Sequence, residues 1–192
     1  MTDEDYWIAQ AIGTVAAIIG IAAFQLRRDN ILFLALATSA FTWSIHFLVL
    51  GAMSAAAINV VTGLRNLSGI WFRSRALGIV FATGYVVAAL WTYESAWDLL
   101  PLIAVLSGTA AVFFARGLWV RACFLVGSVV WVVFNVHAGS LPGIAMMAAD
   151  GASNLIYILR RLHGRGDREF PATESHALGA WRRLLHRRKD LT

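Results

Sequence analysis

The sequence has few charged residues, few prolines and only one cysteine. Aspartate, glutamate, lysine and arginine make up 14% of the 192 residues, whereas 59% are hydrophobic and the mean hydropathy is +0.67. Soluble domains contain about 25% charged residues, so this composition excludes an ordinary soluble domain and predicts an integral membrane protein. The lone Cys123 excludes an internal disulfide and a cysteine-rich metal site.

Long apolar runs, separated by charged residues, predict an all-α polytopic protein with seven transmembrane helices. About 20 apolar residues are needed for a helix to span a bilayer. Runs such as AAIIGIAAF are apolar on every face and lack the alternation of a membrane strand. We expect the spans at 7–26, 31–50, 52–72, 76–93, 97–115, 118–138 and 140–160.

The positions of the basic residues predict the orientation in the membrane. Fifteen of the sixteen lie after the first, third or fifth span, at the start of the sixth, or in the C-terminal tail. Basic residues in short loops are retained in the cytoplasm. We therefore expect the N-terminus outside and the C-terminus in the cytoplasm. The N-terminal MTDEDYW lacks a basic region, so no cleavable signal peptide is expected.

An internal repeat relates the two halves of the chain. The stretch from Trp43 to Asn66 recurs in altered form 88 residues later, from Trp131 to Asn154. Aligning 12–73 (the first copy) with 100–161 (the second copy) gives thirteen identities in 62 positions. Roughly five would arise by chance in so biased a composition, so the repeat needs an explanation.

Both copies begin on the outer face, so they are expected to be parallel three-helix bundles. Three helices cross the membrane an odd number of times, and parallel copies therefore need one extra helix between them. The expected organisation is a first repeat at 1–75, a linker helix at 76–96, a second repeat at 97–162 and a basic cytoplasmic tail at 163–192.

The tryptophan on the second helix and the asparagine on the third helix of each copy point to a known family. This 3+1+3 arrangement resembles the SWEET and PQ-loop transporter superfamily. The segments FQLRRDN and WSIHFLVLGAMSAAAINVVTGLRN are similar to the YgjV-type bacterial inner membrane proteins. The resemblance implies a bacterial inner membrane location and transport of a small polar solute that is sugar-, nucleoside- or vitamin-like.

Trp43 and Asn59 are expected at the same depth on adjacent helices, about 12 Å below the outer edge. Trp131 repeats the tryptophan, whereas Met147 replaces the amide. Two facing indole rings would stack on a flat or weakly polar solute, and a buried amide would add a directional hydrogen bond. The alternative is that the paired tryptophans only pack the core.

Asn66 and Asn154 lie two turns nearer the cytoplasm. They are expected either to join helices or to form part of a cytoplasmic gate or binding site.

Arg65 and Asp150 are the only charges well inside the expected spans. Intramembrane charges are costly unless they are paired or hydrated, so we predict an ion pair or water-linked pair between the copies. It would either gate the site or lock the copies together. His46 could couple transport to protons, or it could hydrogen-bond a backbone carbonyl.

These features favour a transporter or facilitator with a central site between the bundles. The alternatives are a non-transporting membrane binding or scaffold protein on the same fold, and a channel. No zinc-ligand spacing, phosphate-binding glycine loop or catalytic triad is found, so neither an enzyme nor a cofactor is expected.

The expected partners are the solute and anionic lipid headgroups. The headgroups would contact an amphipathic helix in the tail at about 174–189. Nucleic acid is not expected as a partner. The chain could act as a monomer or as a homo-oligomer.

Overall fold

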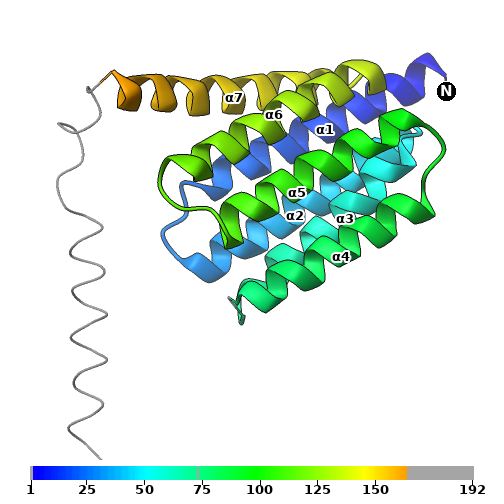
Figure 1. Ribbon diagram of the computed structural model, residues 1–192. Helices are drawn as coiled ribbons and strands as arrows, with labels where there is room; N and C mark the ends of the chain where they lie inside the picture. Colours follow the sequence, from blue (N-terminus) through cyan, green and yellow to red (C-terminus); the bar gives the residue numbers. More distant parts are fainter. Residues whose placement is uncertain (1, 73, 164–192) are drawn as a thin grey trace, which may run out of the picture. The chain divides into compact units, whose positions relative to one another are not determined.

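A computed structural model describes residues 2–72 and 74–163, and within these ranges the chain is helical without strands (Figure 1). The seven predicted helices are all present in this part of the chain. They are α1 (Asp3–Ala23), α2 (Asp29–Val49), α3 (Met53–Ser68), α4 (Arg75–Trp91), α5 (Leu99–Phe113), α6 (Leu118–Ala138) and α7 (Leu141–Leu162), with a short 3-10 turn η1 (Ala96–Asp98) before α5.

The chain divides into two compact units, residues 1–155 and 156–192. The first unit contains α1 to α6 and most of α7. Of the second unit, the structure describes only the last turns of α7 and His163, whose Nδ1 lies 2.7 Å from the carbonyl oxygen of Leu159. The amphipathic helix predicted at 174–189 lies outside the described residues.

Neighbouring helices of the first unit pack in chain order from α1 to α6, and α3 also contacts α5. Small residues bring α1 close to α2 and α5 close to α6. Ser39 donates a 2.8 Å hydrogen bond to the carbonyl oxygen of Ala16. At the equivalent place in the second copy, a Cβ on Gly127 would lie 3.2 Å from the carbonyl oxygen of Ala104. Close approach through small residues is typical of packing between membrane helices.

The helices themselves repeat with the spacing found in the sequence. Helix α3 begins at Met53 and α7 begins at Leu141, a difference of 88 residues. The turns before these helices contain Gly51 and Gly139, also 88 residues apart, with φ of 76° and 71°. Positive φ is unfavourable for residues with a Cβ, so both copies use glycine for the same tight turn.

Four helices are long and apolar enough to cross a membrane: α1, α2, α6, and α5 together with its preceding 3-10 turn. Helix α4 is apolar but has only 17 residues. Helix α3 has 16 residues, which corresponds to a length of about 24 Å. It ends at Ser68 rather than at the predicted residue 72. Membrane crossing by α3, α4 and α7 therefore stays a prediction.

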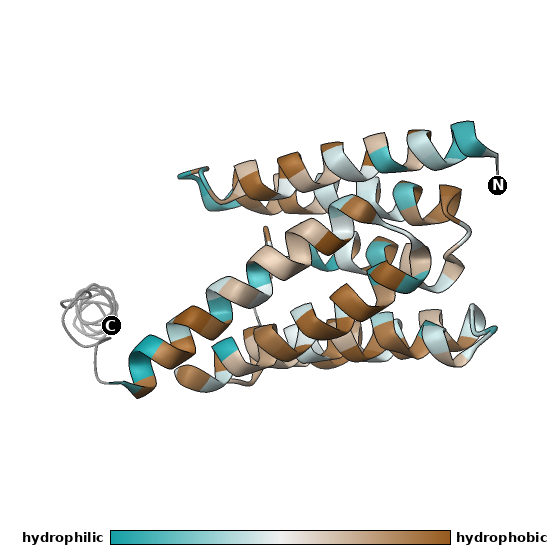
Figure 2. Ribbon diagram, turned by 90° about the horizontal axis from the view of Figure 1, so that it is seen from above, coloured by the Kyte–Doolittle hydropathy of each residue, from teal (hydrophilic) through white to brown (hydrophobic). Residues whose placement is uncertain are grey.

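The surface of the first unit is strongly apolar. Large side chains such as Trp91 and Trp119 are 88% and 74% exposed. Figure 2 shows hydrophobic residues along most of the helices, with hydrophilic residues at the N-terminal end of α1 and in the loop that follows it. Exposed apolar surface on this scale is unfavourable in water and suits contact with lipid.

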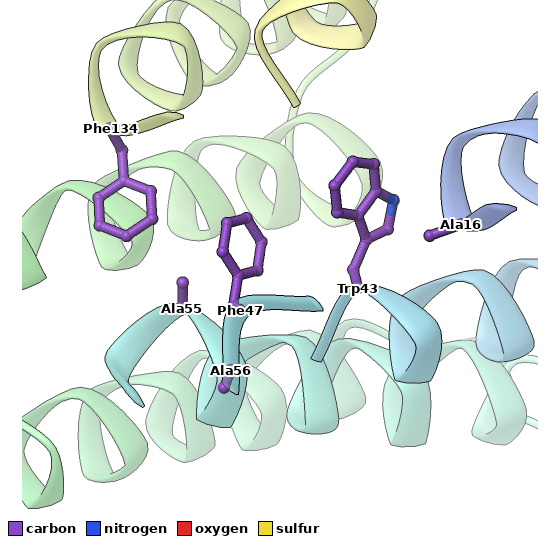
Figure 3. Close-up of a cluster of buried hydrophobic side chains, with 6 residues drawn as sticks. All are labelled: Ala16, Trp43, Phe47, Ala55, Ala56 and Phe134. Atoms are coloured by element: carbon purple, nitrogen blue, oxygen red, sulfur yellow. The ribbon is translucent and has the colours of Figure 1, made fainter. Parts of the chain in front are cut away.

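The main core lies between α1, α2, α3 and α6. Trp43, Phe47 and Phe134 extend from their helices into one common space (Figure 3). The alanines Ala16, Ala55 and Ala56 complete this cluster and let the helices approach closely. A smaller cluster of Ile58, Tyr85 and Ala89 joins α3 to α4.

Candidate functional site

A cavity of about 330 Å³ lies in the first unit, and every helix of that unit except α4 contributes to its wall. The lining residues come from α1, α2 and α3 in the first copy and from α5, α6 and α7 in the second, with Phe24 just beyond the end of α1. Ligand sites of small molecules range from about 300 to 1,000 Å³, so the volume suits a small solute.

The wall of this cavity follows the internal repeat. Sixteen of its residues form eight pairs whose members are 88 positions apart, one from each copy. Such pairing means that equivalent faces of the two copies line one common space. The pairs are Gly20/Gly108, Leu36/Phe124, Ser39/Gly127, Ala40/Ser128, Trp43/Trp131, Phe47/Asn135, Asn59/Met147 and Thr62/Asp150.

The two tryptophans line the cavity as predicted, but they do not form an empty slot between their rings. Phe47 stacks on both, with ring-centre distances of 5.8 Å and interplanar angles of 26° to Trp43 and 17° to Trp131. Phe47 therefore occupies the place expected for a solute between the indoles, and contact of a solute with either tryptophan stays a prediction. The reason is one of helix geometry, because Phe47 follows Trp43 by one turn and shares its face.

The amides predicted on α3 are both in the wall. Asn59 is buried and donates a 2.9 Å hydrogen bond to the carbonyl oxygen of Ala55. Asn66 accepts a hydrogen bond of 3.4 Å from Arg65. Thr62, between these amides, donates to the carbonyl oxygen of Ile58. The first copy therefore gives the cavity a line of polar side chains along α3.

Arg65 and Asp150 both line the cavity but do not form the direct ion pair that we predicted. Arg65 donates to Thr109 Oγ1 and to the side chain of Asn66, each at 3.4 Å. Asp150 Oδ2 accepts from Ser128 Oγ and, at 3.2 Å, from Asn154 Nδ2. Each charge has its own neutral partners, so the water-linked form of the pair stays a prediction.

Asn154 is 2% exposed and is not part of the cavity wall. Its amide nitrogen contacts Asp150, and its Oδ1 accepts a 3.2 Å hydrogen bond from Arg121. Asn154 therefore positions the carboxylate of Asp150, while its repeat partner Asn66 lines the cavity directly.

His46 is fully buried and is also not part of the wall. Its Nδ1 lies 2.6 Å from the carbonyl oxygen of Ala9, and its Nε2 lies 2.7 Å from Ser140 Oγ. Gln10 makes two further hydrogen bonds nearby. Its Nε2 donates to the carbonyl oxygen of Gly139, and its Oε1 accepts from the backbone N–H of Leu141. These contacts join α1 and α2 to the turn between α6 and α7.

Asn135 is a site residue that the sequence did not single out for this role. It is 1% exposed, lines the cavity and donates a 2.7 Å hydrogen bond to the carbonyl oxygen of Trp131. Its Oδ1 has no hydrogen-bond partner within the described residues. A buried acceptor without a partner is unfavourable, and this oxygen packs against Gly143 of α7. The sequence feature that could have predicted this role is its position, 88 residues after Phe47 and therefore equivalent to Phe47 in the repeat.

The two ends of the cavity differ in their access to the surface. At one end, the open end, the wall includes Phe24, which is 69% exposed. At the other, the closed end, it includes Phe47 and Asn135, which are 3% and 1% exposed. The hydrogen bonds of His46 and Gln10 lie next to this closed end, since the backbone N–H of Ser140, the partner of His46, donates to the carbonyl oxygen of Asn135. Hydrogen bonds between the two halves of the chain therefore lie beside the buried end of the cavity.

No group of histidine, cysteine or acidic side chains that could hold a metal ion occurs in 2–72 or 74–163. The arrangement of apolar helices around a partly polar cavity defines a polytopic membrane protein with a small-molecule-sized site.

The comparisons with known proteins identify the family. A family described as Imp-YgjV, bacterial inner membrane protein, matches residues 7–164. The inner membrane protein YgjV of Escherichia coli (strain K12) is 30% identical over 167 residues, which cover 84% of this chain and 89% of that protein. No solved structure matches the chain. The chain belongs to the Imp-YgjV family, and it is a multi-pass protein of the bacterial inner membrane.

Proposed function

We propose that the protein is a transporter or facilitator of a small polar solute, which binds in the cavity between the two copies. The observation that carries this proposal is the pairing of the wall, in which eight positions of the first copy each have an equivalent in the second. A pseudo-symmetric site between two repeats suits alternating access, because either repeat can tilt against the other around the bound solute.

In this proposal the copies form the 3+1+3 arrangement, with α4 as the linker. Support comes from α4, which contacts α3 and α5 but provides none of the cavity residues. The open end lies on the side of Arg27, Arg28 and Arg116, and the positive-inside rule assigns that side to the cytoplasm. The structure would then be an inward-facing state with its outer end sealed.

The wall suggests how a solute would be held. Trp43 and Trp131 offer apolar aromatic surface, while Asn59 and Asn66 offer polar side chains. All of these residues come from one chain, so a monomer is sufficient to form the site.

The proposal is tested with purified protein in proteoliposomes. Uptake of labelled sugars, nucleosides, vitamins and amino acids is measured for the wild type and for Trp43→Ala. The matched control is Trp119→Ala, because Trp119 is 74% exposed on α6 and does not line the cavity. We expect uptake that Trp43→Ala abolishes and Trp119→Ala retains. Uptake that both variants retain equally would remove the cavity from the transport path.

A second candidate is a binding or scaffold protein that retains the fold without transport. The stack of Phe47 on both tryptophans favours it, because this stack must separate before a solute can pass. Ligand-induced thermal stabilisation without any flux into proteoliposomes would select this candidate over the transporter.

A further inference from the structure

The cavity wall contains one cationic and one anionic side chain, and they are not paired with each other. These are Arg65 on α3 of the first copy and Asp150 on α7 of the second. A charge inside a membrane protein is costly unless an opposite charge or water compensates it. The cavity as a whole is therefore balanced in charge but offers two separate charged contacts.

Arg65 retains most of its capacity to bind an anion. A guanidinium group has five N–H donors, and Arg65 uses two of its nitrogens in long contacts of 3.4 Å to neutral oxygens of Thr109 and Asn66. Charge-assisted bonds from arginine to a carboxylate are shorter and stronger, and they are often bidentate. A carboxylate of a solute could therefore replace these weak contacts.

Asp150 is held in place by neutral donors and keeps one oxygen available. Both hydrogen bonds to its side chain, from Ser128 and Asn154, go to Oδ2. Among the described residues, Oδ1 accepts no hydrogen bond, and the residue is exposed along the cavity. An ammonium group has three donors and no acceptor, so it matches an oriented carboxylate with one free oxygen.

We propose that the solute is a zwitterion of the amino-acid type, with its carboxylate on Arg65 and its ammonium group on Asp150. This inference rests on the proposed function and specifies the class of solute. A zwitterion compensates both wall charges and adds no net charge to the cavity. A solute of one sign would leave one wall charge unpaired, and a sugar would leave both. Trp43, Trp131 and Met146 would contact the apolar part of the molecule.

The first test is thermal-shift titration of the purified full-length protein with the twenty common L-amino acids, D-glucose and uridine. The best amino acid is then compared with its deaminated and decarboxylated analogues, which each keep one charge. We expect the amino acid to bind roughly tenfold to a hundredfold more tightly than either analogue, because each lost contact is a charge-assisted hydrogen bond.

Two substitutions then test which charge binds which group. In Arg65→Gln the amino acid should bind at least about tenfold more weakly, while the analogue with only an ammonium group should bind as well as before or better. Asp150→Asn should show the reverse, favouring the analogue with only a carboxylate. This exchange of preference is not expected from loss of folding. Ser153→Ala, at an exposed position on α7 outside the cavity wall, is the matched control.

The possible outcomes separate this inference from the proposed function. Stabilisation by glucose or uridine alone, lost in Trp43→Ala, would overturn the zwitterion and leave the cavity as a solute site. Binding of an amino acid with no exchange of preference in the two variants would also overturn it. Absence of binding and of uptake for every compound would overturn the proposed function as well.

Discussion

His46 Nε2 and Ser140 Oγ lie 2.7 Å apart and are both fully buried, although 94 residues separate them in the chain. This contact, together with the two hydrogen bonds of Gln10, ties the first copy to the second at the closed end of the cavity. In the proposed transporter, opening this end would break these bonds in each cycle, and the bound solute would have to bias that change. The same contacts would then concern both stability and transport.

Replacing His46 by leucine should destabilise the protein. The substitution leaves the carbonyl oxygen of Ala9 and the hydroxyl of Ser140 without this partner in a buried place. We expect a loss of about 1–3 kcal/mol in the free energy of unfolding, measured by thermal or denaturant unfolding in detergent. His163→Gln is the control, since His163 is exposed. Equal stability of His46→Leu and the wild type would contradict this account.

The contacts of His46 also predict that it does not couple transport to protons. A carbonyl oxygen only accepts, so the bond to Ala9 assigns a proton to Nδ1, and in the neutral ring Nε2 accepts from Ser140. The neutral ring is satisfied on both nitrogens and does not line the cavity. We expect the pH dependence of uptake to be the same in the wild type and in His46→Gln. Loss of that dependence in the variant would restore the proton-coupling hypothesis.

Phe47→Ala should open a space against the faces of two indole rings. Removing a buried phenylalanine costs about 3–5 kcal/mol, and we expect indole to restore part of this stability by stacking on Trp43 and Trp131. Phe134→Ala is the control, because Phe134 belongs to the same core but contacts Phe47 and Trp131 edge-on. The measurement is thermal unfolding with and without indole. Equal rescue of both variants would argue against the stack.

The repeated turn glycines should respond alike to substitution. Gly51 and Gly139 both have positive φ, so alanine at either position should cost about 1–2 kcal/mol from the backbone alone. A Cβ at Gly51 would meet no atom within 4 Å, so steric contact makes no contribution there. Gly108→Ala is the control, since it too has open space but lies inside α5. It should stabilise the protein by about 1 kcal/mol. Unfolding in detergent measures all three.

Much of the fold could be predicted from the sequence because apolar runs and charged breaks have a direct physical meaning. The seven helices occur near their predicted positions, and the 88-residue repeat reappears in the turns at Gly51 and Gly139. Helix α3 ended early because Gly69 and the turn after it interrupt a run that is still apolar. Hydropathy measures the lipid preference of such a run, and it does not show where the helical hydrogen bonds stop.

The sequence predicted how deep the residues of the candidate site lie in the membrane, but not which way their side chains point. A rise of about 1.5 Å per residue placed Trp43 and Asn59 at one depth, and the cost of intramembrane charge drew attention to Arg65 and Asp150. All four line the cavity. The rotation of each helix about its axis depends on packing that no single sequence specifies. For that reason His46 was not distinguished from the residues of the wall.

Phe47 and Asn135 line the cavity, but identity between the copies does not predict them. Both are one turn after a repeated tryptophan and occupy equivalent positions in the two copies. Phenylalanine and asparagine are not identical, so the identities between the two copies do not include this pair of positions. Equivalent positions with unlike residues are where a duplicated site becomes asymmetric.

The separation of Arg65 and Asp150 between the copies has a consequence for how the chain must be assembled. A dimer of two first copies would bring two guanidinium groups and no carboxylate to the shared space, and a dimer of two second copies would bring two carboxylates. Neither half can build the balanced site with a duplicate of itself. Joining the halves through α4 guarantees one of each in every molecule, so the covalent link would fix the stoichiometry that the proposed zwitterion site requires.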